Sequence, residues 1–147
     1  MASSICAAAL LASCTAPTVS DAGTAVQRIE LGASAFNAGE IGHAWLLERA
    51  QRTAVTLALS GVPGWVARPV HLYAYVQRGS CAATAAEPAY ALTGRVLARR
   101  GGDGFLTLTN TLPVSLETLR AGDHALVVRS SPADADRPLF CGDLRPL

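Results

Sequence analysis

Val55-Thr56-Leu57-Ala58-Leu59-Ser60 is the stretch that decides the fold class of this chain. Apolar side chains alternate with small or polar ones, so every second residue faces one side of an extended strand. Gly61-Val62-Pro63-Gly64 follows directly and ends the strand, because Gly and Pro favour turns over regular pairing. The stretch therefore predicts a half-buried β-strand that closes on a tight break.

The same strand signals recur on both sides of this stretch. Ala125-Leu126-Val127-Val128 is a short apolar run typical of a buried strand. Gly101-Gly102-Asp103-Gly104 predicts a hairpin turn, because Gly and Asp tolerate positive φ, and the hairpin would pair residues 94–99 with 105–111. Further strands are predicted at 26–31, 41–47 and 70–77.

One segment departs from the strand pattern. Ser115 can cap a single helical turn that directs Leu116 and Leu119 towards the core. About eight short strands with turns between them nevertheless predict an all-β, antiparallel sandwich or barrel.

The N-terminus carries a processing motif. Leu11-Ala12-Ser13-Cys14 follows a short apolar run and matches the lipobox, at which bacteria cleave a lipoprotein precursor before the lipid-bearing Cys. This predicts a signal peptide over 1–13, a flexible tether over 14–23 that starts at lipidated Cys14, and one domain over 24–147. An ordinary secretory signal that contains a Cys is the alternative, and Met1-Ala2-Ser3-Ser4 lacks the usual positive charge.

The lipobox predicts that the protein is located in the bacterial cell envelope. The apolar run is too short to span a bilayer. Thr15 stands where an Asp often retains a lipoprotein in the inner membrane, so it favours the outer membrane, with the domain facing the periplasm or the surface. The net charge of +1, with 12 basic residues that are all Arg and 11 acidic ones, gives no electrostatic reason to bind nucleic acid.

The four Cys residues divide into two groups. Cys6 leaves with the signal, and Cys14 accepts the lipid. Cys81 and Cys141 remain in an oxidising compartment, where a disulfide is expected and would contribute about 4 kcal/mol in the chain-entropy model. Two free thiols or a two-Cys metal site are the alternatives.

Four segments in order resemble the copper/zinc superoxide dismutase-like and CHRD-like domains, over residues 25–145. The resemblance implies an eight-stranded Greek-key β-sandwich, with a disulfide from the loop after one strand to the last strand. The segments are Gly42-His43-Ala44-Trp45-Leu46, Val76-Gln77-Arg78-Gly79-Ser80-Cys81, Ala125-Leu126-Val127-Val128-Arg129-Ser130 and Cys141-Gly142-Asp143-Leu144.

The same resemblance implies that the metal site of this family is lost. Tyr75 and Gln77 stand where the family has two copper-binding His residues, and Arg129 stands at the position of a third. A permanently cationic guanidinium repels copper. No cofactor is therefore expected, and His43 and two further imidazoles are expected to stay apart. The other two are His71 and His124.

Tyr73, Tyr75, Gln77 and Arg129 form the candidate binding patch, since the resemblance implies that they gather where the metal would lie. They fill the vacated space as a polar plug or recognise an anion, a glycan or a protein partner. A second candidate, a Ca²⁺ site, is weighed against a solvated loop with Arg137 as the local counter-charge. Its carboxylates are those of Asp134, Asp136 and Asp143.

No Gly-x-Ser-x-Gly nucleophile motif and no phosphate loop occur. The leading hypothesis is a non-enzymatic, lipid-anchored envelope module that binds an envelope protein, a second copy of itself or another ligand. One alternative is a copper- or zinc-binding or dismutase-type protein with rearranged ligands. The other is a structural subunit of an envelope assembly.

Overall fold

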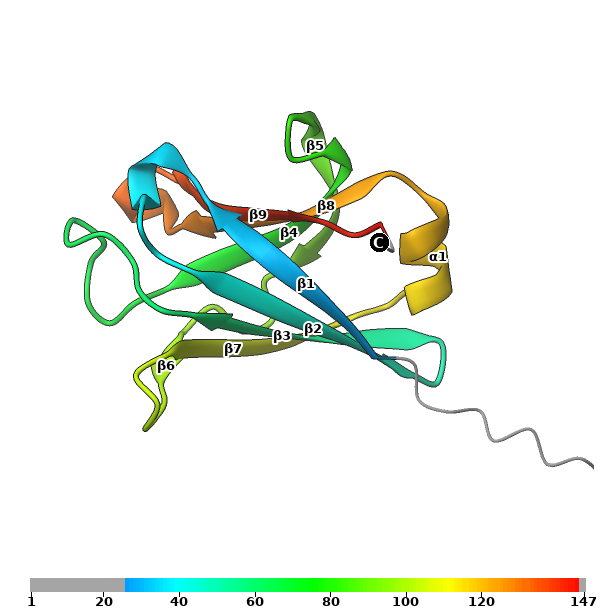
Figure 1. Ribbon diagram of the computed structural model, residues 1–147, viewed down its shortest axis with the longest axis horizontal. Helices are drawn as coiled ribbons and strands as arrows, with labels where there is room; N and C mark the ends of the chain where they lie inside the picture. The colour runs from blue at the N-terminus through cyan, green and yellow to red at the C-terminus, as the bar shows by residue number, and fades with distance from the viewer. Residues whose placement is uncertain (1–25, 146–147) are drawn as a thin grey trace, which may run out of the picture.

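Nine antiparallel strands form one continuous sheet in the computed structural model, which describes residues 26–145 (Figure 1). The order across the sheet is β5-β4-β8-β9-β1-β2-β3-β7-β6. The strands are β1 (Val26–Ala33), β2 (Gly42–Arg49), β3 (Arg52–Leu59), β4 (Leu72–Ser80), β5 (Ala83–Leu92), β6 (Arg99–Arg100), β7 (Leu106–Leu112), β8 (His124–Ser130) and β9 (Pro138–Asp143). A helix, α1 (Leu116–Ala121), and two 3-10 turns, η1 (Ala35–Asn37) and η2 (Pro132–Asp134), connect them.

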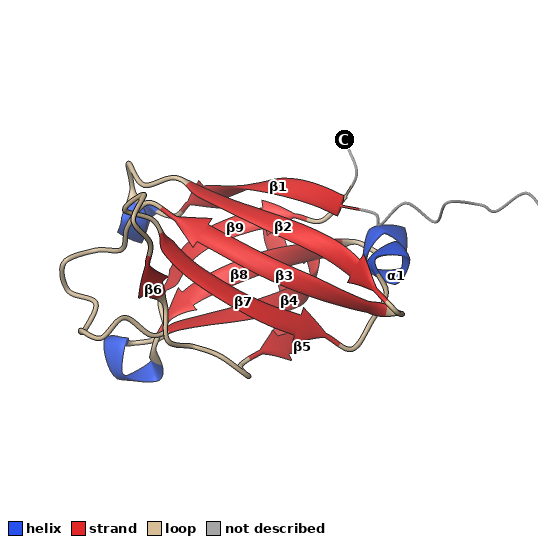
Figure 2. Ribbon diagram, turned by 90° about the horizontal axis from the view of Figure 1, so that it is seen from below, coloured by secondary structure: helices blue, strands red, loops and turns tan. Residues whose placement is uncertain are grey.

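The sheet curls so that β1, β2, β3 and β7 lie in front of β9, β8 and β4 (Figure 2). β1 joins the two halves, because it pairs with β2 along its length and its last residues, Gly32 and Ala33, pair with β9. One hydrophobic core receives side chains from both halves, among them Leu57 and Phe140. The all-β antiparallel class is confirmed with nine strands instead of about eight, and the Greek-key sandwich stays a prediction.

β3 shows why the alternating stretch becomes a strand. Val55, Leu57 and Leu59 are at most 1% exposed, whereas Thr56 between them is half-buried on the opposite face. Each such apolar side chain contributes about 1.5–3 kcal/mol when it leaves water. The alternation therefore fixes which face of β3 packs inward, as predicted.

The helical turn is confirmed as well. Ser115 caps α1, its Oγ accepting a hydrogen bond from the Thr118 N–H at 3.1 Å, and Leu116 and Leu119 are buried. The Glu48 carboxylate on β2 accepts the Leu116 N–H at 2.5 Å, which ties the start of the helix to the sheet. Capping of this kind satisfies N–H groups that a helix leaves unpaired at its first turn.

Two features of the chain between β4 and β7 differ from the prediction. β5 was not expected, because its side chains are small and mostly exposed and alternation is absent. The predicted pairing of 94–99 with 105–111 is wrong in extent, since only Arg99 and Arg100 pair with β7. The backbone of the preceding segment instead forms hydrogen bonds with the start of β4, through Val96 and Ala98.

The two ends of the curled sheet carry different elements (Figure 1). β1 begins, and β9 ends, near α1, whereas η1, η2 and the loop between β3 and β4 lie at the opposite end. The predicted signal peptide, Cys14 and the tether over 14–23 lie outside the described residues. None of the helices within 26–145 has the length and apolar character needed to cross a membrane.

Candidate functional site

Three of the four predicted patch residues line one cleft on the outer face of β4 and β8. Tyr75 and Gln77 come from β4, and Arg129 comes from the neighbouring strand β8. Asp136, from the loop after η2, closes one side of the cleft. The space measures about 300 Å³, and β5 supplies its remaining wall through Ala86 and Pro88.

The turn between β4 and β5 raises that wall over the sheet. The β4–β5 pairing shifts register on both sides of Gln77, so the hairpin bends away from a flat sheet. Gly79 has a φ of 95°, and a Cβ there would lie 2.2 Å from the carbonyl oxygen of Ala83. Only glycine can therefore make this turn.

A disulfide holds the raised hairpin against the last strand. Cys81 and Cys141 are bonded, with their Cα atoms 5.8 Å apart, which confirms the expected pairing and rules out the two alternatives. The backbone N–H of Cys81 also donates to Oδ1 of Asp143 at 2.7 Å. The wall of the cleft is thus fixed to β9 at the tip of the hairpin.

Arg129 enters the cleft already paired. Its Nε donates to Oδ1 of Asp136 at 2.9 Å, and its Nη2 donates to the Asp136 carbonyl oxygen at 2.5 Å. Ala135 and Asp136 both have positive φ, which turns the chain so that the carboxylate and carbonyl face the same guanidinium. The cleft therefore holds a neutral ion pair.

Arg137, expected as a local counter-charge, forms no ion pair with Asp134 or Asp136. Its guanidinium lies 4.8 Å from the ring centre of Phe36 and 5.7 Å from that of Trp65. Cation–π contact competes well with a solvated ion pair, because the latter contributes little at a surface. Asp136 instead forms its ion pair with Arg129, seven residues earlier in the chain, which the linear sequence did not indicate.

Tyr75 lies beside this ion pair. Partial burial raises the pKa of its phenol above the ordinary value of 10.0, and the Asp136 carboxylate raises it further, while Arg129 acts in the opposite direction. Tyr73, the fourth patch residue, pairs in register with Arg129 and does not line the cleft. Tyr75 is thus a neutral hydroxyl at physiological pH, able to donate or accept a hydrogen bond.

The donor set in the cleft does not suit copper or zinc. The cleft offers a phenol with a raised pKa, a carboxamide and an ion-paired guanidinium, whereas copper chemistry needs imidazoles. The three His residues lie apart: His43 contacts Glu30 at 2.9 Å, His124 contacts the Leu119 carbonyl, and His71 bridges to Leu97. Within 26–145, no three His, Cys, Asp or Glu side chains are grouped for a metal ion.

The three carboxylates weighed for Ca²⁺ are engaged separately. Asp134 accepts from the backbone N–H of Ala67 and the Ser131 hydroxyl, so it joins η2 to the loop before β4. Asp136 serves Arg129, and Asp143 serves the Cys81 N–H. Their oxygens therefore hold loops in place and do not converge on a common point.

What the arrangement offers is binding chemistry. An aromatic ring, a buried carboxamide and a neutralised ion pair present several hydrogen-bonding groups with little net charge. Sequence reasoning missed Asp136 as a partner and β5 as a wall, because neither an Ala-rich edge strand nor a turn-dependent ion pair leaves a local pattern. Comparison with family models, with curated proteins and with solved structures finds no match.

Proposed function

We propose that this chain is a lipid-anchored, non-catalytic envelope module that binds a neutral, hydroxyl-rich ligand, such as a saccharide unit, in the cleft at Tyr75. The observation that carries this proposal is the Arg129–Asp136 ion pair at 2.9 Å inside the cleft. Paired guanidinium and carboxylate groups keep donors and acceptors available while cancelling their charges. A ligand with many hydroxyl groups matches such a surface better than a free anion does.

The size and lining of the cleft support a small ligand. Its volume of about 300 Å³ falls at the lower end of known ligand sites, which accords with one or two sugar rings. Tyr75 supplies an aromatic ring and a hydroxyl, and Gln77 is only 8% exposed, so packing restricts the motion of its carboxamide. A fixed polar lining costs little ordering entropy on binding.

Anchoring at Cys14 would hold the domain close to an envelope surface. The described domain begins at Val26, so 12 residues from Cys14 connect the lipid to the sheet. A chain of that length reaches at most about 40 Å. The elements far from this attachment, η1, η2 and the loop between β3 and β4, would then face away from the membrane (Figure 1).

The binding proposal is tested by calorimetric titration of the full chain with neutral oligosaccharides of hexoses and N-acetylhexosamines. Binding is expected, with loss of about tenfold in affinity for Tyr75→Ala, because hydrogen bonds and aromatic contact both disappear. Trp45→Ala is the matched control, since Trp45 is an exposed aromatic residue on β2, outside the cleft. Equal loss in both variants, or no binding of any neutral sugar, would overturn the proposal.

The anchor is tested by mass spectrometry of the protein produced in a Gram-negative host. We expect a mature chain that begins at Cys14 and carries acyl groups. Cys14→Ser should leave an unprocessed chain without lipid. Cleavage at another residue, or an acyl-free Cys14, would refute the anchoring half of the proposal and leave the cleft unaffected.

A further inference from the structure

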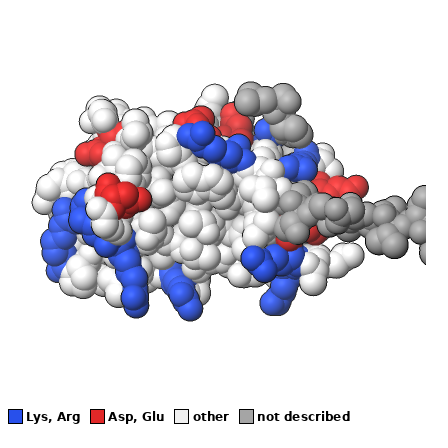
Figure 3. Space-filling model, turned by 60° about the horizontal axis from the view of Figure 1, so that its bottom comes forward, with Lys and Arg blue, Asp and Glu red and all other residues white. Residues whose placement is uncertain are grey.

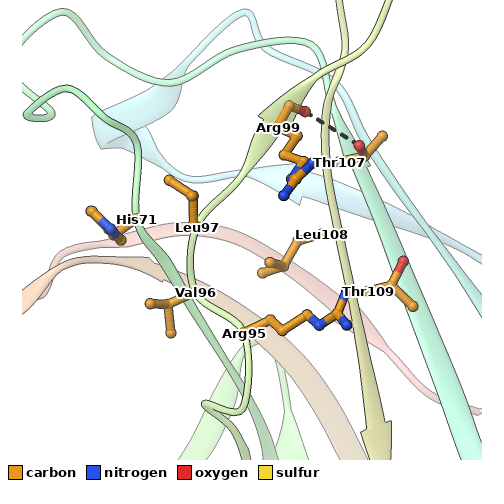
Figure 4. A pocket seen from close by; sticks show the side chains of 8 residues that line it. All are labelled: His71, Arg95, Val96, Leu97, Arg99, Thr107, Leu108 and Thr109. Atoms are coloured by element: carbon orange, nitrogen blue, oxygen red, sulfur yellow. Dashed lines mark hydrogen bonds between the residues drawn. The ribbon is translucent and has the colours of Figure 1, made fainter.

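A second hollow lies where the curled sheet would otherwise stay open, between β4 and β7. The segment between β5 and β6 crosses this opening, with Val96 and Ala98 hydrogen-bonded to Leu72 and Val70 at the start of β4. The space against it measures about 460 Å³ and is called the seam groove here. Its lining residues are His71, Arg95, Val96, Leu97, Arg99, Thr107, Leu108 and Thr109 (Figure 4).

Two arginines of the seam groove are held at their backbones by side chains of β7. The Asn110 carboxamide bonds both the N–H and the carbonyl of Arg95, each at 2.9 Å, as a neighbouring strand would. The Thr107 hydroxyl donates to the Arg99 carbonyl at 3.2 Å (Figure 4). The backbones of Arg95 and Arg99 are therefore both held against β7, which fixes where their side chains begin.

The guanidinium groups of these arginines, by contrast, are free. Neither Arg95 nor Arg99 donates a side-chain hydrogen bond or forms an ion pair with another residue of 26–145. Figure 4 shows both side chains reaching towards β7, one on each side of Leu108. The Asp103 carboxylate, which follows Arg99 in the hairpin turn, accepts the Phe105 N–H through Oδ1 and forms no ion pair with Arg95 or Arg99.

The surrounding surface also carries basic side chains. They line the margin of the molecule on which β6 lies, with an acidic group among them at one end, while the middle of that face carries no charged side chains (Figure 3). Arg100 is adjacent to Arg99 and donates to the Gly104 carbonyl oxygen within the turn. Two guanidinium groups that lack a carboxylate partner and line one groove both attract an anion placed between them.

We propose that the seam groove binds a phosphate-type oxyanion between the guanidinium groups of Arg95 and Arg99. A guanidinium donates two parallel N–H bonds that match two oxygens of a phosphate, and two such groups match a diphosphate or two neighbouring phosphates. Thr109 on β7 also lines the groove, and its hydroxyl shares a hydrogen bond of 3.2 Å with the Thr56 hydroxyl. This site is separate from the cleft at Tyr75 and does not depend on it.

The test uses the full chain with Cys14→Ser, which carries no acyl group, and vesicle binding at the groove is taken as the difference between this chain and Arg95→Gln/Arg99→Gln, because both keep the same apolar run over 5–11. Inorganic pyrophosphate is titrated by calorimetry, and vesicles of phosphatidylglycerol or phosphatidylcholine are used in co-sedimentation. Binding is expected to weaken by about tenfold or more in Arg95→Gln/Arg99→Gln, because charge-assisted contacts are lost. Arg49→Gln/Arg52→Gln removes equal charge at the β2–β3 turn and should change affinity by less than about twofold, since distant surface charges are screened.

The two arms separate the sources of the phosphate group. Binding of pyrophosphate without phosphatidylglycerol vesicles identifies a soluble phosphate ligand, whereas vesicle binding that pyrophosphate displaces identifies a lipid headgroup. Absence of binding in both arms overturns the proposal. So does equal binding by the chain with and without Arg95 and Arg99, or an equal loss in the Arg49/Arg52 control. Circular dichroism before each titration shows that the exposed substitutions leave the sheet intact.

Discussion

The cleft at Tyr75 and the seam groove both contain arginine, and they use it in opposite ways. Arg129, with 27% of its side chain exposed, is paired with Asp136 at 2.9 Å. Arg95 and Arg99 are exposed and have no side-chain partner within 26–145. A guanidinium that leaves water needs a counter-charge, whereas one that stays in water can remain available for a ligand. The same residue type thus marks a neutral site in one place and an anion site in the other.

The two hollows also differ in what holds them. A disulfide and a glycine turn fix the wall of the cleft, whereas hydrogen bonds from one strand, β7, fix the arginines of the seam groove. The cleft should therefore respond to changes in covalent structure and backbone conformation. The seam groove should respond to the loss of single side chains.

Among the changes that separate the two hollows, removal of the disulfide is expected to lower the stability of the protein most. Cys81→Ala/Cys141→Ala releases two residues 60 apart in sequence, which costs about 4 kcal/mol in the chain-entropy model. Urea denaturation at equilibrium measures the loss. Sugar affinity at the cleft should fall as well, because the hairpin wall is freed, while pyrophosphate affinity at the seam groove should not change below the unfolding transition. An unchanged unfolding midpoint would contradict the role given to this bond.

Gly79→Ala should come next in size. Positive φ and a Cβ only 2.2 Å from the Ala83 carbonyl oxygen leave no room for a methyl group, so we expect a loss of about 2–3 kcal/mol. Gly94→Ala beside the seam groove is the control, because a Cβ there meets its nearest atom, Oδ1 of Asn110, at an ordinary 3.5 Å. Thermal melts of both variants decide the matter, and equal midpoints would show that the hairpin does not need glycine.

Loss of the Asn110 carboxamide should affect the seam groove and spare the cleft. Asn110 is 9% exposed and supports both backbone groups of Arg95, so Asn110→Ala is expected to cost about 1–2 kcal/mol. Pyrophosphate affinity should fall because Arg95 is no longer held, whereas sugar affinity should not. Thr111→Ala, an exposed change on the same strand, serves as control. If Asn110→Ala keeps full pyrophosphate affinity, Asn110 does not position Arg95 for anion binding.

The smallest expected effect is on the ionisation of Tyr75. Burial and Asp136 raise the pKa of this phenol in the folded protein, so its contribution to stability is present below pH 10 and is lost as pH rises through the raised value. Asp136→Asn should lower that pKa without restoring 10.0, because burial remains the larger cause. Absorbance at 295 nm follows the titration, with Tyr75→Phe as the variant that lacks this step. An identical curve for Asp136→Asn would mean that the carboxylate does not act on Tyr75.

Patterns within a single strand or turn were readable from the sequence. Alternation fixed the inward face of β3, the apolar run marked β8, and Ser115 marked the start of α1. The pairing of Cys81 with Cys141 followed from their being the two Cys residues outside the predicted signal peptide and lipid-anchor position. These inferences succeed because strand alternation and helix capping depend on neighbouring residues, and the disulfide on the number of Cys residues.

Features that depend on the path of the chain were missed. β5 pairs through its backbone at the edge of the sheet, and Pro88 and its small exposed side chains carry no alternation. Asp136 reaches Arg129 only because Ala135 and Asp136 adopt positive φ, which neither residue type requires. Arg95 was assigned to a strand, since nothing local shows that a side chain of β7 would occupy its backbone groups. Tyr73, expected in the patch, does not line the cleft.

Arginine Nε resonances in a ¹H–¹⁵N spectrum of the full chain test the contrast between the two hollows most directly. The Nε–H of Arg129 should be visible and slow to exchange, because it is bonded to Asp136, and it should be unaffected by pyrophosphate. The Nε–H signals of Arg95 and Arg99 should exchange quickly in the free protein and shift or sharpen when pyrophosphate is added. A pyrophosphate-induced shift at Arg129, with Arg95 and Arg99 unchanged, would contradict the assignment of a neutral cleft and an anion-binding groove.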